Sequence, residues 1–133
     1  GDLMFARALD GTSAERITQA GELVGELSWM SPEVAGSGNP IDTRSDLYSL
    51  GTVLYALLTG RPPLEGRGPA QTIQMILEEE PAPPTTKQLS IPALFEGVVM
   101  QLLEKRPEDR PKSARQLVRD LERVAKYEGM KME

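Results

Sequence analysis

Residues 42–60 read DTRSDLYSLGTVLYALLTG, and this stretch decides the fold. Its apolar side chains recur at helical spacing, and they are Leu47, Leu50, Val53, Leu54, Leu57 and Leu58. Thr43 is predicted to cap the helix, with Asp46 three residues later as its capping-box partner. Gly60 ends the helix, and the prolines after it prevent continuation. Because apolar residues cover most of the circumference, we expect this helix to be central and buried.

Three further helices are predicted on the C-terminal side. They span about 69–79, 90–104 and 113–128, and prolines and charged residues separate them. Ser113 and Gln116 form a capping box at the start of the last helix. The buried face predicted for that helix consists of Leu117, Val118, Leu121, Val124 and Ala125. The tail from Gly129 onward is expected to fray.

The N-terminal side, residues 1–42, shows no sustained periodicity and is rich in Gly, Ser and Thr. We expect a long loop there, with a short helix near Ser31–Ala35. The predicted fold class is therefore mainly α, with about four helices after a long N-terminal loop. The predicted division is 1–42 for the loop, 43–128 for the helical unit and 129–133 for the tail.

Composition excludes several classes of function. The chain has no Cys and no His, so disulfides, thiol chemistry and histidine-based acid–base or metal sites are excluded. The net charge is −5 and basic residues are interspersed with acidic ones, which argues against nucleic-acid binding. No apolar run reaches the roughly 18 residues of a membrane span. The chain begins with Gly1 rather than Met, and we expect the natural polypeptide to extend upstream.

Three short motifs stand out in chain order. They are Trp29-Met30-Ser31-Pro32-Glu33, the stretch Asp42 to Gly51 quoted above, and Lys105-Arg106-Pro107-Glu108-Asp109-Arg110-Pro111. Each has an ordinary structural interpretation, namely a helix start, a capping acid and a solvated charged turn. Together they resemble the end of the activation segment, the central helix and the segment before the last helix in the C-terminal lobe of protein kinases. The resemblance covers about residues 2–125 and is closest to bacterial serine/threonine kinases.

The resemblance implies a role for individual residues. Glu33 matches the glutamate of the family's Ala-Pro-Glu motif and Arg110 matches the arginine that pairs with it. Asp46 matches the aspartate that holds the backbone of the catalytic loop. The pocket for the substrate residue after the target hydroxyl would be shaped by Gly25, Glu26, Leu27, Ser28 and Trp29.

The front edge of the chain matches less well. Asp2 stands where the family has its magnesium-binding aspartate, but Leu3-Met4 replaces the Phe-Gly that follows it. Glu26 replaces a threonine that helps to position the catalytic-loop aspartate, which a carboxylate would repel. The hydroxyls of Thr12, Ser13 and Thr18 match an activation loop that accepts regulatory phosphate, although loops are commonly rich in such residues.

The resemblance implies a parent protein that phosphorylates protein Ser or Thr with ATP and Mg²⁺. The chain has no Gly-x-Gly-x-x-Gly and no His-Arg-Asp, so we expect it to be inactive alone and to bind no cofactor of its own. Two alternatives remain open, a pseudokinase and an unrelated helical adaptor that acts as a protein-interaction module. The expected partners are a protein substrate, the rest of the kinase domain, or a second copy through exposed apolar surface. The expected location is cytoplasmic.

Overall fold

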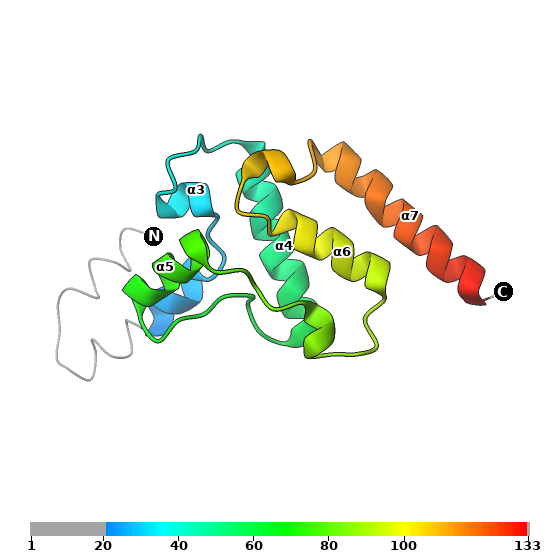
Figure 1. Ribbon diagram of the computed structural model, residues 1–133, viewed down its shortest axis with the longest axis horizontal. Coiled ribbons are helices and arrows are strands. Elements are labelled where there is room, and N and C mark those ends of the chain that lie inside the picture. Colours follow the sequence, from blue (N-terminus) through cyan, green and yellow to red (C-terminus); the bar gives the residue numbers. More distant parts are fainter. Residues whose placement is uncertain (1–20, 133) are drawn as a thin grey trace.

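The computed structural model describes residues 21–132, which form helices and loops and contain no strand. Helix α4 (Thr43–Thr59) lies at the centre, and the other helices are arranged around it (Figure 1). Helix α6 (Ala93–Leu102) packs along it, and α7 (Ala114–Met132) packs on α6 and then extends away from the body (Figure 1). The mainly helical fold with one central helix is as the sequence predicts.

The N-terminal part of the described chain holds two short helical pieces. Residues 21–27 are helical, and Ser31 caps helix α3 (Pro32–Ala35), where its Oγ accepts a hydrogen bond from the Val34 N–H at 3.3 Å. The helix predicted near Ser31–Ala35 is therefore confirmed. The piece at 21–27 was predicted as loop, because Gly21 and Gly25 lower its helix propensity. Tertiary burial compensates, since three apolar side chains of this piece are buried, Leu23, Val24 and Leu27.

Helix α4 begins at Thr43, but the predicted cap is wrong by one residue. Asp42 is the N-cap, and its Oδ1 accepts the Arg44 N–H at 2.8 Å. The carboxylate lies one residue earlier and reaches the unsatisfied N–H groups of the first turn. At the other end, Gly60 adopts φ +87° as the C-cap, a left-handed conformation that glycine adopts without steric cost.

Prolines mark the starts of most of the remaining elements. They are α5 (Pro69–Glu78), η1 (Pro84–Thr86), α6, η2 (Pro107–Asp109) and α7. Helix α6 starts after Pro92 rather than at Ser90, because the residue before a proline is disfavoured in helical conformation. Helix α7 continues to Met132 through Gly129, so the predicted fraying tail is wrong.

The core lies where α4, α6 and α7 meet. One buried cluster joins all three helices and contains Leu47, Val98, Leu102, Leu117 and Val124. A second cluster joins α4 to α6 and contains Tyr48, Tyr55, Val99 and Leu103. Two residues predicted for the buried face of α7 are exposed instead, Val118 at 51% and Ala125, because α6 covers only one edge of that helix.

One face of α4 is not covered by the described residues. Leu50, Val53 and Leu57 follow the spacing i, i+3, i+7 and are 40%, 44% and 77% exposed. We call these three side chains the α4 stripe. The helix is central, as the sequence predicts, and this face is the exposed apolar surface that the sequence also predicts. Within residues 21–132, no helix is long and apolar enough to cross a bilayer.

Candidate functional site

A buried ion pair joins the N-terminal part of the described chain to the segment before α7. Arg110 Nη2 lies 2.6 Å from Glu33 Oε1 and Nη1 lies 2.8 Å from Oε2, so the contact is bidentate. Both side chains are 0% exposed. Ser45 on α4 donates a further hydrogen bond to Glu33 Oε2 at 2.6 Å. The structure thus brings together the two residues that the family resemblance pairs, and adds Ser45.

Arg110 uses all five of its N–H donors. Besides Glu33, it donates to three backbone carbonyls, those of Arg44, Glu104 and Lys105, at 2.9, 2.8 and 3.1 Å. Its guanidinium also lies 5.0 Å from the centre of the Tyr48 ring. A fully satisfied buried charge avoids the penalty of desolvation without a partner. This group therefore holds α3, the start of α4 and the end of α6 in one arrangement.

The charge state of the pair follows from its contacts. Burial by itself would raise the pKa of Glu33, but hydrogen bonds from Arg110 and Ser45 and the positive charge of Arg110 hold that pKa below its ordinary value. The carboxylate is therefore ionised at neutral pH. Burial also raises the pKa of Tyr48, so its phenol stays protonated beside the pair.

A cleft of about 280 Å³ opens beside this ion pair, between α3, the start of α4 and the segment before α3. Its apolar wall is formed by Trp29, Met30, Val34 and Ile41, and its polar wall by Glu26, Ser31, Ser45, Asp46 and Ser49. Val34 and Ile41 are 48% and 65% exposed, so apolar surface remains accessible at this opening. The cleft can therefore hold an apolar group close to two carboxylates.

The predicted substrate-pocket segment divides into lining and buried residues. Glu26 and Trp29 line the cleft, whereas Leu27 and Ser28 are 8% and 2% exposed and do not line it. Ser28 Oγ donates to the Val24 carbonyl at 2.8 Å, and Gly25 lies in the helical piece at 21–27. The Trp29 carbonyl accepts a hydrogen bond from Ser49 Oγ at 2.9 Å, which fixes this segment to α4.

Asp46 is exposed and faces the same cleft as Glu26. Sequence reasoning missed two serines near Asp46. They are Ser45 and Ser49, which lie one helical turn apart on α4. Ser45 reaches Glu33 and Ser49 reaches the Trp29 carbonyl, so one edge of α4 binds both α3 and the segment before it. The i, i+4 spacing of these two serines was the sequence pattern that could have identified them as site residues.

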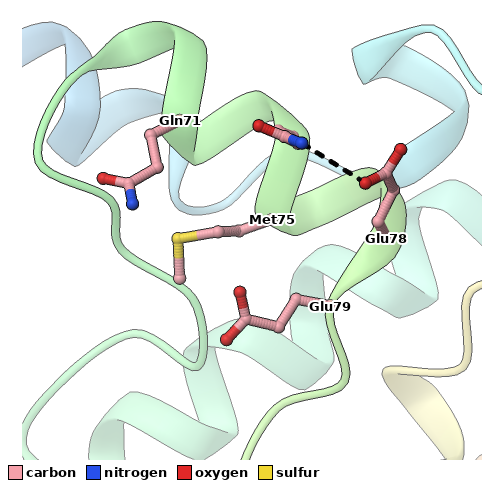
Figure 2. Close-up of a pocket in the computed structure, with 5 residues that line it drawn as sticks. Gln71, Met75, Glu78 and Glu79 are labelled. Carbon is pink, nitrogen blue, oxygen red and sulfur yellow. Dashed lines mark hydrogen bonds between the residues drawn. The ribbon is translucent and has the colours of Figure 1, made fainter.

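Four predicted site residues lie outside the described residues, namely Asp2, Thr12, Ser13 and Thr18. Among the residues that are described, no group of three or more metal-ligating acidic side chains occurs. A separate recess of about 350 Å³ lies on α5, into which Gln71, Met75 and Glu79 point (Figure 2). It contains none of the residues singled out from the sequence, so it is not part of this site.

The chain is similar to known proteins over most of its length. Residues 1–121 match the family described as "Protein kinase domain". The chain is 39% identical over 123 residues to the serine/threonine-protein kinase PknB of Mycobacterium tuberculosis. The aligned region covers 92% of this chain and 19% of that protein. PknB of Mycolicibacterium smegmatis is 38% identical over 128 residues, covering 96% of the chain and 20% of that protein. A probable serine/threonine-protein kinase of Corynebacterium efficiens is 40% identical, covering 94% and 19%.

Proposed function

Because the chain belongs to the protein kinase domain family, we propose that it forms the substrate-side half of a catalytic domain that phosphorylates Ser or Thr of proteins. The chain spans about a fifth of the length of the relatives it matches, at 19% to 20%. The observation that carries the proposal is the buried pair of Glu33 and Arg110 beside the cleft. The names of the relatives, all serine/threonine kinases, support the acceptor class.

In this proposal the described residues position the acceptor and do not transfer the phosphoryl group. The Glu33–Arg110 pair and the Ser49 bond hold the walls of the cleft in place, and Trp29 provides an apolar wall for a substrate side chain. Asp46, exposed at the start of α4, would accept hydrogen bonds from the backbone of the catalytic loop. Positioning of this kind accounts for much of the catalysis in phosphoryl transfer.

The cofactors of the whole catalytic domain are proposed to be ATP and Mg²⁺. Asp2 would supply one metal-binding carboxylate, and Thr12, Ser13 and Thr18 would be acceptors of regulatory phosphate. These roles come from the family resemblance and concern residues outside the described part of the chain. We also propose a cytoplasmic location for the catalytic domain, where ATP is available to it.

A pseudokinase is the second candidate, and one observation favours it. Glu26 lines the cleft together with Asp46, where the family has a threonine at the position of Glu26. A second carboxylate near the catalytic-loop aspartate would disfavour its ionised form, which is the form that can accept a proton. The protein would then use the same cleft for binding alone.

The α4 stripe is proposed as the surface that receives another part of the kinase domain. Its three side chains would otherwise leave apolar area in water on the central helix of the fold. A second copy of this chain is the other occupant that the sequence predicts. Covering about 400 Å² would favour association by about 10 kcal/mol before the entropic costs of binding.

The test uses the complete protein encoded by the reading frame that contains this chain. With labelled ATP, Mg²⁺ and an acceptor protein, we expect phosphoserine or phosphothreonine to form. Asp46→Ala should strongly reduce the incorporation without unfolding the protein, because Asp46 is exposed, whereas Glu122→Ala on the exposed side of α7 should have no effect. Binding of ATP without any transfer would favour the pseudokinase, and no binding of ATP would contradict the proposal.

A further inference from the structure

A groove of about 300 Å³ runs between α6 and α7 and shares no residue with the cleft. Val98 and Val124 are buried at its base, and Leu94 stands at its edge, 46% exposed. Gly97 lines the groove, and a Cβ atom built there would meet nothing within 4 Å, so the space beside it is open. An exposed leucine and an unfilled hollow thus lie one helical turn apart on α6.

We propose that this groove is an interface between two copies of the chain related by a two-fold axis. In such an interface the same surface patch is used twice and must be complementary to itself. With the axis passing between Leu94 and Gly97, each Leu94 would enter the hollow above the partner's Gly97. Each exposed leucine would therefore be buried, and each hollow would be filled by the leucine of the other copy.

The charges at the groove favour a second copy over an unrelated peptide. Asp120 and Arg123 border the groove one turn apart on α7, and within one copy the contact between Arg123 Nη1 and Asp120 Oδ1 is long, at 3.7 Å. The Arg123 side chain is 74% exposed and can reach outward. A two-fold axis perpendicular to α7 reverses its direction, so each Arg123 would face the partner's Asp120. A peptide with only acidic residues would be repelled by Asp120, and a peptide with only basic residues would be repelled by Arg123.

Helix α7 offers further area for this contact. Beyond Arg123, the side chains of Tyr127 and Met130 follow at i+4 and i+7 and are 48% and 64% exposed. Both belong to the C-terminal part of α7, and this end of the helix extends away from the body (Figure 1). A stable interface needs about 800 Å² from each copy, and the extended α7 adds to the area of the groove itself.

Analytical ultracentrifugation of the full chain over a concentration series tests the proposal. All samples carry Leu57→Glu, so that the α4 stripe cannot cause association. We expect a reversible monomer–dimer equilibrium. Arg123→Asp and Asp120→Lys should each weaken dimerisation by at least about tenfold, as should Gly97→Leu, which fills the hollow. Glu122→Lys, an exposed charge reversal on the same helix, should leave dimerisation unchanged.

A mixture of the Arg123→Asp and Asp120→Lys chains gives the decisive result. One chain then carries two acidic residues at the groove and the other two basic ones, so the mixed dimer should recover while each chain alone stays monomeric. Contacts within one chain cannot be rescued in this way. The chain that carries Leu57→Glu alone would overturn the proposal if it is monomeric at every concentration. The proposal would also fail if the single groove variants have no effect on dimerisation, or if the mixture does not recover the dimer. Circular dichroism of every variant confirms that α7 remains folded, and Gly97→Leu decides the case if Asp120→Lys unfolds.

Discussion

Arg110 joins parts of the chain that are far apart in sequence. Its partners are the Glu33 carboxylate, the Arg44 carbonyl at the start of α4, and the carbonyls of Glu104 and Lys105 after α6. The planar guanidinium supplies five donors in fixed directions, whereas lysine has three donors on one atom. No other charged side chain could therefore satisfy this set of acceptors at one position.

We predict that Arg110→Ala lowers the free energy of unfolding by about 3–5 kcal/mol, because Glu33 would remain buried without its partner. Urea denaturation followed by circular dichroism measures the change. Lys126→Ala is the matched control, because Lys126 is exposed on α7. A loss no larger than that of the control would show that the pair is not important for stability.

The same pair predicts how stability depends on pH. Burial would raise the pKa of Glu33, but Arg110 and Ser45 hold it below its ordinary value, so the unfolded chain takes up the proton at a higher pH than the folded chain. The stabilisation is complete above the unfolded pKa of about 4.3 and is lost as the pH falls through the lower folded pKa.

Between about pH 5 and pH 3, the free energy of unfolding should therefore fall more steeply in the native chain than in Glu33→Gln. Urea denaturation at a series of pH values tests this, with Glu122→Gln as the exposed control. Parallel curves for the native chain and Glu33→Gln would be inconsistent with an ionised, paired carboxylate.

At the scale of elements, the contact between α4 and α6 depends on a glycine. A Cβ atom at Gly51 would lie 2.7 Å from Leu102 Cβ and 3.1 Å from Leu103 Cδ2. Glycine is an unfavourable helix residue, so its presence in the middle of α4 is explained by this close approach rather than by propensity.

We predict that Gly51→Ala destabilises the fold by about 1–3 kcal/mol, because overpacking outweighs the gain in helix propensity of about 1 kcal/mol. Gly129→Ala in α7 is the control, because a Cβ there would meet nothing within 4 Å. That variant should be neutral or slightly more stable in thermal unfolding. Equal stabilisation by both substitutions would mean that α4 and α6 separate easily.

The α4 stripe makes a second prediction at this scale. Leu57→Glu should lower both the binding of a hydrophobic dye and any concentration-dependent increase in mass that arises from α4, because it places a charge on the most exposed member of the stripe. Val118→Glu is the control, since Val118 is 51% exposed but lies on α7. Light scattering and dye fluorescence measure the two effects. Equal responses of both variants would show that the stripe has no special role.

At the scale of the whole molecule, the described helices contain no loop that could cradle a nucleotide. The site residues that they bring together come from α3, α4 and the segment before α7, and none is a phosphate-binding loop. We therefore predict that the 133-residue chain alone shows no measurable phosphoryl transfer and negligible affinity for ATP with Mg²⁺.

Isothermal titration calorimetry with ATP and Mg²⁺ tests the affinity. The complete protein, titrated in the same way, is the positive control. Micromolar binding by the isolated chain would contradict the prediction and would require a nucleotide site that the family resemblance does not include.

Local chemistry in the sequence determined most of the helical architecture. Apolar spacing, glycine and proline placed α4, α5 and α6 to within a few residues, because these signals act through neighbours along the chain. The errors at Asp42 and at the end of α7 concern helix termini, where one residue of capping chemistry decides the boundary.

The sequence by itself also determined the family, because three motifs occur in the family's order. Only the tertiary structure decided the rest. Helical periodicity shows which residues share a face but not which neighbour covers it. The identity of the residues in the α4 stripe and the exposure of Val118 therefore depended on where α6 and α7 pack. Likewise, Ser45, Tyr48 and the backbone carbonyls around Arg110 belong to the site because folding brings residues 33 and 110 into contact across 77 positions of the chain.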